Sequence, residues 1–263
     1  MKLEFACEVN IGPRPTNDDR AMILNEILDQ RFLEGEAQTP AAAVVCDGCG
    51  GYAGGGTAAE TVLEVLRADG PGIFESADAL ANLLEKAQRE LMRKKAEVPA
   101  LREMCTTVAG CLFLEKGLIV FHSGDSRIYR FDGSHLARMT VDHSVVQEMV
   151  DLGMIREDEA LTHPRRNVIT RCLGIECQPP EIRSSSGPIR PGEIFLLCSD
   201  GLWEALTPAA IRQILASPQS LGEKARALVR AAAENGSADN ITACLCSCPG
   251  GEPAREEEPF ILD

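Results

Sequence analysis

The chain has 263 residues, and its 26 Lys and Arg against 40 Asp and Glu give a formal net charge of −14. Hydrophobic residues make up 44% and charged residues 25%, an ordinary globular composition that excludes disordered, collagenous and coiled-coil classes. So acidic a surface repels nucleic-acid phosphates and anionic lipids, and the sequence has no local basic stripe. We therefore expect neither nucleic-acid nor membrane binding, whereas divalent cations suit the excess of carboxylates.

The first ten residues, MKLEFACEVN, show no secretory signal, because Glu4 and Glu8 interrupt the apolar residues. No later segment approaches the roughly 18 uninterrupted apolar residues of a membrane span. We expect a cytoplasmic, monomeric protein with one domain over residues 1–248 and a flexible acidic tail over 249–263. Its 11 cysteines are an odd number in a chain too long to need disulfide staples, and we expect reduced, mostly buried thiols.

The first half of the chain predicts a strand followed by two helices. The strand is 41–46 (AAAVVC), an apolar run that stops at Asp47-Gly48 and enters a glycine-rich loop. Thr57 is expected to cap a helix that ends before the Asp-Gly-Pro-Gly sequence at 69–72. Leucines at helical spacing predict a second helix over about 77–95.

The second half begins with a strand-rich region and returns to helices. From Cys105 to Thr140, β-branched and aromatic residues between turn signals predict an antiparallel meander of three or four strands. The later segments are a helix at 144–153, a loop at 161–168, a strand at 193–198, helices near 208–216 and 220–235, and a strand at 240–246. Helices before and after a strand-rich middle predict an α+β fold, with helices packed on antiparallel sheets.

Aspartates recur where predicted strands end or begin. They are Asp19, Asp47, Asp200 and Asp239. A carboxylate at the edge of a core is costly unless it is paired or binds a cation, and several together repel one another. Mg²⁺ and Mn²⁺ prefer oxygen ligands, and two such ions can make a water molecule nucleophilic near neutral pH. Convergence of these side chains would therefore build a metal-dependent hydrolytic site.

Six blocks together resemble one known family. They are RPTNDD (14–19), VVCDGCGGYAGG (44–55), CTTVAGCL (105–112), HSGDSRIY (122–129), LLCSDGLW (196–203) and DNIT (239–242). In this order, and over nearly the whole chain, they resemble the metal-dependent protein phosphatases of the 2C type in their compact bacterial form.

The resemblance implies a four-layer αββα sandwich, two central antiparallel sheets flanked by helices, with two Mn²⁺ or Mg²⁺ ions at one edge. The implied direct ligands are Asp19, Asp47, Asp200, Asp239 and the backbone carbonyl of Gly48. Asp125 corresponds to the residue that helps bind a weaker third metal in bacterial relatives. A metal-bridging hydroxide would then hydrolyse phosphoserine or phosphothreonine in phosphorylated proteins, opposing a serine/threonine kinase.

Three further residues receive roles from the resemblance. Arg14 would hold the substrate phosphate, which its planar fork suits; the alternative is a surface salt bridge with Asp18 or Asp19. Asp18 would orient metal-bound water, although the family usually carries Glu or Gln there. Asn240 would position the neighbouring ligand by hydrogen bonding.

Two features depart from the family pattern or extend it. Cys49 stands where eukaryotic members often carry a histidine that protonates the leaving group, which leaves the general acid unassigned. Residues 145–172 correspond to a flap beside the active site, and its arginines suit an anionic phosphopeptide or simply a solvated loop. A catalytically weak relative that binds phosphoproteins or acts as a regulatory module is the alternative to an enzyme.

Two competing motifs are weaker. Residues 48–53 satisfy the dinucleotide pattern G-x-G-x-x-A, but Asp47 would repel the pyrophosphate and no acid-terminated strand follows about 20 residues later. Cys46 and Cys49 could seed a zinc site, but no second C-x-x-C or helical histidine pair accompanies them. Buried or exposed thiols are the favoured interpretation of both cysteines.

Overall fold

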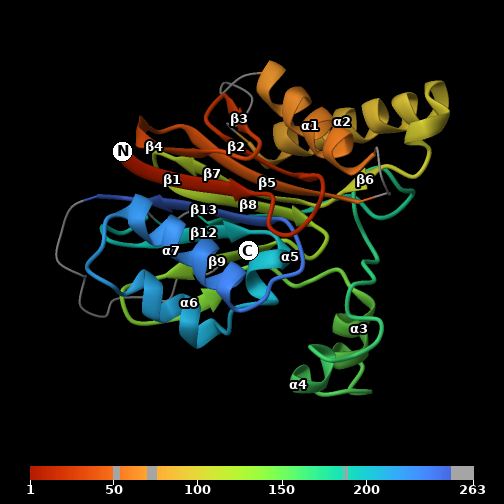
Figure 1. Cartoon of the computed structure of the whole chain (residues 1–263). Coiled ribbons are helices and arrows are strands. Elements are labelled where there is room, and N and C mark those ends of the chain that lie inside the picture. Colours follow the sequence, from red (N-terminus) through yellow and green to blue (C-terminus); the bar gives the residue numbers. More distant parts are fainter. Residues whose placement is uncertain (50–53, 70–75, 186, 188, 250–263) are drawn as a thin grey trace.

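Two antiparallel sheets stacked face to face, with helices on both outer faces, form the body of the protein (Figure 1). The structure is a computed structural model, and it describes residues 1–49, 54–69, 76–185, 187 and 189–249. The αββα order of layers confirms the fold class expected from the sequence. The predicted tail lies outside the described residues, apart from Pro249.

The first sheet has six strands in the order β10-β9-β12-β13-β1-β4. Its strands are β1 (Lys2–Asn10), β4 (Phe32–Gln38), β9 (Arg127–Phe131), β10 (Leu136–Arg138), β12 (Ile194–Cys198) and β13 (Ile241–Ser247). Every neighbouring pair is antiparallel, and both termini of the sandwich contribute central strands, since β1 pairs with β13.

The second sheet has the order β11-β8-β7-β5-β2-β3, with the short β6 paired to the end of β5. Its strands are β2 (Asp19–Ile23), β3 (Glu26–Leu28), β5 (Ala41–Cys49), β6 (Cys105–Thr106), β7 (Val108–Leu114), β8 (Gly117–Ser123) and β11 (Glu181–Ser185). These pairs are antiparallel too.

Helices cover the two outer faces. The second sheet is covered by α1 (Gly55–Ala68) and α2 (Ala77–Glu97), which leads into the 3₁₀ turn Pro99–Leu101. The first sheet is covered by α5 (Asp200–Trp203), α6 (Pro208–Leu215) and α7 (Leu221–Glu234). Within the described part of the chain, no helix combines the length and apolar character that crossing a membrane requires.

The two-residue period of the strands explains the layers. In β5, Ala43 and Val45 point into the core between the sheets, whereas Val44 and Cys46 point outward under α1 and α2. Successive side chains of a strand alternate between faces, so a strand that is apolar on both faces needs a cover on both. The continuous apolar run that predicted this strand is therefore the signature of its place in the middle of the sandwich.

The flap predicted at 145–172 contains two short helices, α3 (Val145–Asp151) and α4 (Glu157–Ala160). Figure 1 shows both standing apart from the sandwich on an extended arm. Ser144 caps α3 by accepting a hydrogen bond from the backbone N–H of Gln147. The segment thus has local structure of its own.

Three local expectations were wrong. Helix α1 begins at Gly55 with Gly54 as its N-cap, so Thr57 lies inside the helix. Strand β5 continues through Asp47 to Cys49, because β2 and β6 offer it backbone partners there. The expected meander does not stay in one sheet: β7 pairs with β8, but β9 pairs with β12 of the other sheet.

The expectation of reduced thiols was wrong for two cysteines. Cys49 and Cys105 stand directly opposite each other in the β5–β6 pair and form a disulfide. The other nine are free thiols, and of these only Cys177 is exposed. Strand register therefore brings together two cysteines that are 56 residues apart in sequence.

Candidate metal centre

Both sheets deliver aspartates to one region of the molecule. Asp19 opens β2 and stands opposite Asp47 of β5 in the strand register. From the other sheet, Asp200 begins α5 directly after β12, and Asp239 lies two residues before β13. The pKa values of Asp19, Asp47 and Asp200 are each raised by the charge of at least one other member of the group, and Asp239 acts on all three, so four acids far apart in sequence face a common space.

Asp19 is the most enclosed member, with 1% of its surface exposed. Its Oδ2 accepts hydrogen bonds from Ser199 Oγ at 2.6 Å and from Thr242 Oγ1 at 2.7 Å. Its Oδ1 is buried with no hydrogen-bond partner. Burial raises the pKa of Asp19 to about 6, against the lowering effect of the two hydroxyl donors.

Asp47 and Asp200 are held near Asp19 with few partners of their own. Burial raises the pKa of Asp47 well above its usual range, and the charge of Asp19 raises it further. Burial likewise raises the pKa of Asp200, together with the charges of Asp125 and Asp239. One oxygen of Asp200, Oδ1, is also buried without a partner. In the absence of a cation these carboxylates destabilise one another.

This donor set fits a divalent cation. Buried carboxylate oxygens without protein partners are expected where a hard cation binds, because the ion supplies the positive charge that no protein group provides. Among the described residues, no three of these carboxylates bring oxygens within 4.8 Å of one another. A bound ion would therefore draw the side chains together, which their single-bond rotations allow.

Close backbone packing explains the glycines of the centre. A side chain at Gly48 would collide with the backbone of Gly55, since a Cβ placed there lies 2.1 Å from the Gly55 carbonyl oxygen. At Gly201, a Cβ would lie 2.0 Å from the carbonyl oxygen of Asn240. Each glycine directly follows an aspartate of the centre. The Asp-Gly pairs of the sequence thus let backbones pass close to the carboxylates.

Arg14 lies beside the centre and is bound to Asp239. Its Nη2 donates to Asp239 Oδ2 at 2.7 Å, and its Nε donates to the Ala238 carbonyl at 2.8 Å. The two side chains are 51% and 35% exposed. The alternative partners weighed from the sequence, Asp18 and Asp19, are not those it contacts.

Asn240 ties the loop before β2 to the segment before β13. Its Nδ2 donates to the carbonyls of Ile11 and Thr16, and its Oδ1 accepts from the Asp18 backbone N–H at 2.8 Å. Its own backbone N–H donates to Asp239 Oδ1. The Asp18 carboxylate turns toward helix α1, where its Oδ1 accepts from the Gly56 N–H at 2.9 Å.

Asp125 is buried at the side of the centre nearest to Asp200. Burial raises the pKa of Asp125 to about 7, and the charge of Asp142 adds to the effect. Trp203 fixes its backbone, because the indole Nε1–H donates to the Asp125 carbonyl at 3.0 Å. The Trp203 ring in turn carries the Arg127 guanidinium 3.4 Å from its centroid. Arg127 is held by an ion pair with Asp142.

Sequence reasoning missed these supporting residues. Ser199 and Thr242 donate to Asp19, and neither was assigned a role from the sequence. Trp203 packs in the core at 9% exposure, and its N–H also holds Asp125. The available signal was closeness in sequence to a predicted ligand, since Ser199 directly precedes Asp200, Trp203 ends the helix that Asp200 begins, and Thr242 follows Asp239 by three residues.

The flap arginines are mostly engaged with acids of their own neighbourhood. Arg156 pairs with Asp158, and Arg171 with Glu181. Arg166 differs, because its Nε lies 3.9 Å from Glu204 Oε1, at the C-terminal cap of α5. It provides the link between the flap and the helix that begins with Asp200.

A helix-covered double sheet with an acidic centre between its strand ends defines a metal-dependent hydrolase. The family model described as protein phosphatase 2C matches residues 28–246. The chain belongs to the protein phosphatase 2C family. This confirms the family expected from the sequence and, with it, the enzyme class of protein phosphatases.

Similar phosphatases are found in several bacteria. Protein phosphatase PhpP of Streptococcus pneumoniae is 34% identical over 211 residues, which cover 78% of this chain and 84% of that protein. The serine/threonine phosphatase stp of Listeria innocua is 29% identical over 208 residues, 77% of this chain and 82% of the relative.

Solved structures share the fold over almost the whole chain. The Mycobacterium tuberculosis serine/threonine phosphatase PstP/Ppp superposes with a TM-score of 0.82 at 29% identity, covering 95% of this chain and all of that one. The catalytic domain of PstP in complex with two manganese ions gives a TM-score of 0.79 at 26% identity, covering 95% of this chain and 100% of that one.

Proposed function

We propose that the chain is a metal-dependent serine/threonine phosphatase that hydrolyses phosphoserine and phosphothreonine in phosphorylated proteins. The observation that carries the proposal is the group of buried and half-buried aspartates from both sheets, two of which have buried oxygens without any protein partner. A relative with the same fold in complex with two manganese ions supports a two-ion cofactor. We propose that the ions are Mn²⁺ or Mg²⁺ and that a third binds beside Asp125, a carboxyl whose pKa is raised by burial.

In this proposal Asp19, Asp47, Asp200, Asp239 and the Gly48 carbonyl hold the ions. Bound divalent ions supply a nucleophile from solvent and neutralise the phosphoryl oxygens. Ser199 and Thr242 keep Asp19 oriented, and Asn240 keeps Asp18 and Asp239 in register. The protein's contribution is therefore to position charged groups before substrate arrives.

Arg14 binds the substrate phosphate in this scheme. Its pairing with Asp239 places its guanidinium at the exposed edge of the centre, where a phosphoryl group would enter. A guanidinium can donate to two phosphate oxygens in one plane, which also orients the scissile bond. Asp239 and the phosphate would both accept hydrogen bonds from the Arg14 guanidinium.

Cys49 does not supply the proton for the leaving alkoxide in the state described. Its sulfur is bonded to Cys105 and carries no hydrogen. The serine or threonine alkoxide must therefore take its proton from another group, and solvent held by Asp18 at the same edge is our candidate.

We further propose that the protein acts in the cytoplasm as a monomer, opposing a serine/threonine kinase. The catalytic domain spans residues 1–248, and the flap at 145–172 contacts the substrate protein next to the phosphorylated residue. The Arg166–Glu204 contact supports this placement of the flap, since Glu204 also lies close enough to Asp239 for their charges to interact.

Hydrolysis of a phosphothreonine peptide with Mn²⁺, and its loss with EDTA, tests the proposal. Phosphotyrosine peptide provides the matched substrate control. We expect Mn²⁺-dependent turnover of the phosphothreonine peptide. Binding of the peptide without turnover at any metal concentration would contradict the proposal and favour a phosphoprotein-binding regulatory module.

A further inference from the structure

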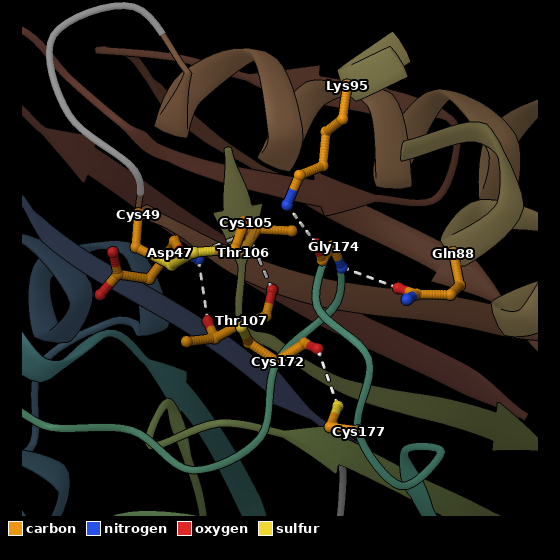
Figure 2. The surroundings of a disulfide bond; sticks show 10 residues. All are labelled: Asp47, Cys49, Gln88, Lys95, Cys105, Thr106, Thr107, Cys172, Gly174 and Cys177. Carbon is orange, nitrogen blue, oxygen red and sulfur yellow. Dashed lines mark hydrogen bonds between the residues drawn. A yellow bond between two sulfur atoms is a disulfide. The ribbon is translucent and has the colours of Figure 1, made fainter. Parts of the chain in front are cut away.

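A cluster of sulfur atoms lies next to the candidate metal centre. Cys49 and Cys105 are joined by a disulfide with a Cα–Cα distance of 5.0 Å. The sulfur of a third cysteine, Cys172, lies within 4.8 Å of both. Figure 2 shows the disulfide beside Asp47, with Cys172 arriving from a separate segment of the chain.

The disulfide is attached directly to the backbone that carries the predicted ligands. Cys49 follows Gly48 in strand β5, and β6 holds the same backbone by hydrogen bonds. Thr107 accepts from the Asp47 N–H through its Oγ1 at 3.0 Å and donates its own N–H to the Asp47 carbonyl at 2.8 Å. The Thr106 hydroxyl donates to the same carbonyl. Hydrogen bonds thus hold the backbone of Asp47, whereas Gly48 is restrained through the disulfide of the next residue, Cys49.

Cys172 joins this cluster to the end of the flap and to a cavity. Its neighbour Leu173 exchanges two backbone hydrogen bonds of 2.9 Å with Thr106. Cys172 and the exposed Cys177 both line a mainly apolar cavity of about 200 Å³ between α2 and the segment 172–182. Cys172 therefore connects a space open to small molecules with the disulfide behind it.

We propose that Cys49, Cys105 and Cys172 form a redox-modification site, in which the Cys49–Cys105 bond is a reversible disulfide and Cys172 is its exchange partner. The inference rests on the proposed function, since it assigns regulation to the same centre. In the cytoplasmic location proposed above, disulfides are uncommon and serve mainly catalytic or redox-sensing roles. Small thiols, disulfides and peroxides are the ligands this site takes.

The chemistry balances with those reagents. A peroxide oxidises one thiol to a sulfenic acid with release of water or an alcohol, and the second thiol displaces a water molecule from it to form the S–S bond. In the reverse direction, an external dithiol gives up two electrons and two protons and leaves both cysteines as thiols.

Internal exchange needs no external reagent. The Cys172 thiolate attacks one sulfur of the disulfide, a new S–S bond forms as the old one breaks, and the departing thiolate takes up the proton that Cys172 lost. Burial raises the pKa of the Cys172 thiol to about 12; the nearby Cys177 and Asp125 add to this effect, and Lys95 opposes it. Exchange is therefore slow near neutral pH, and the pair joined in the structure is Cys49–Cys105.

The disulfide restrains the end of β5. Removing it leaves the hydrogen bonds to Asp47 in place but releases the Gly48–Cys49 end, whose carbonyl is a proposed ligand. Preorganised ligands bind a cation more tightly than ligands that must be ordered on binding. We expect the oxidised protein to bind Mn²⁺ about three- to tenfold more tightly than the reduced protein.

The test equilibrates the full chain in glutathione buffers of different ratio, maps disulfides by mass spectrometry, and measures Mn²⁺ affinity calorimetrically in each state. We expect a Cys49–Cys105 linked peptide in oxidising buffer and the stated change in affinity on reduction. Cys105→Ser should show the weaker affinity in both buffers. In the wild type, exchange should also give a small fraction of peptides in which Cys172 is linked to Cys49 or Cys105. Cys172→Ser should lose these peptides and keep the Cys49–Cys105 disulfide.

Cys177→Ser is the matched control, because it removes an exposed thiol of the same cavity and leaves the disulfide intact. Absence of the Cys49–Cys105 peptide, equal Mn²⁺ affinity in both redox states, or a stoichiometric zinc ion bound by the three thiolates would each overturn the inference. Turnover assayed in parallel separates the two proposals. Full activity without a redox effect on affinity refutes this inference alone, whereas a redox effect on affinity without turnover refutes the phosphatase proposal.

Discussion

The two sides of the candidate metal centre differ in how their carboxylates are held. On the buried side, Asp19 is fixed by two hydroxyl donors and Asp47 by its place in a strand, and neither has a cationic partner within hydrogen-bonding distance in the described structure. On the exposed side, Asp239 has the Arg14 guanidinium at 2.7 Å. The carboxylates of Asp19 and Asp47 are therefore desolvated and repel each other. The carboxylate of Asp239 is exposed to solvent, and Arg14 neutralises its charge.

This difference indicates a division of work. The buried side carries an electrostatic cost that a cation or a proton would relieve, which supports our proposal that this side binds the metal ions tightly. The exposed side already has its counter-charge, and a pair at the surface exchanges partners at little cost. In the proposed scheme, Arg14 can therefore bind a phosphate beside Asp239 without disturbing the buried side.

The largest expected effect follows from neutralising the buried side. Asp47→Asn should lower kcat/KM for a phosphothreonine peptide by roughly 100-fold or more, because it removes a proposed direct metal ligand. In EDTA the same variant should unfold at a temperature a few degrees higher than wild type, since one repelling charge is gone. Steady-state kinetics and thermal unfolding measure the two effects.

Asp78→Asn is the control for that variant, because Asp78 is an exposed residue in the first turn of α2, a helix that carries no proposed ligand. Loss of activity with loss of stability in EDTA would contradict the account, since it would make Asp47 a stabilising structural residue.

The second effect is a pH dependence of the metal-free protein. The folded pKa is about 6 for Asp19 and about 7 for Asp125, both above the ordinary value of 3.8. The folded state therefore binds more protons, and its stabilisation is complete below about pH 4 and lost as pH rises toward 7. The free energy of unfolding in EDTA should fall by roughly 2 kcal/mol or more across this range.

Urea unfolding at several pH values, with EDTA and with Mn²⁺, measures this slope. Saturating Mn²⁺ should remove it, because a bound cation replaces the protons. A free energy of unfolding in EDTA that rises from pH 4.5 to 7 would show that these carboxylates are stabilised as anions, contrary to the account.

A smaller effect is expected on the exposed side. Arg14→Ala should raise KM for the phosphothreonine peptide and lower kcat/KM about tenfold, since one phosphate contact of roughly 1.4 kcal/mol is lost. Mn²⁺ affinity should not fall, because the substitution removes a positive charge beside the centre. Arg31→Ala removes a comparable exposed pair, Arg31–Glu26 at 3.0 Å, and serves as control. A large loss of Mn²⁺ affinity would place Arg14 in the metal site itself.

The smallest effect concerns the support of Asp125. Trp203→Phe removes the N–H that donates to the Asp125 carbonyl and should cost about 1 kcal/mol of the free energy of unfolding. Turnover at saturating Mn²⁺ should stay within about twofold of wild type, because the substitution touches no direct ligand. Loss of activity at unchanged stability would contradict this account, because it would give Trp203 a catalytic role.

The sequence predicted well whatever depends on local pattern. The apolar runs before Asp47 and Asp200 predicted buried strands, and leucine spacing predicted α2 close to its observed Ala77–Glu97. Apolar periodicity reflects which faces are buried, so it is legible without knowing the partners. The α1 start was misplaced because Thr57 resembles a cap while Gly54 supplies one by backbone geometry alone.

Contacts between segments that are distant in sequence could not be predicted from local patterns. Nothing in the local sequence distinguishes Asp239 from Asp18 as the partner of Arg14, because the choice depends on a contact 225 residues apart. The same holds for the Ser199 hydroxyl on Asp19, 180 residues away, and for the opposition of Cys49 and Cys105. Register and sheet order determine these contacts, and neither is encoded within one segment.

The most direct test of the account is the stoichiometry of Mn²⁺ binding to wild type and to Asp19→Asn and Asp200→Asn, measured by isothermal titration calorimetry at neutral pH. The account predicts two tightly bound ions in the wild type and loss of at least one in each variant. Full Mn²⁺ binding by both variants, or none by a folded wild type, would contradict the claim that these buried acids form a metal centre.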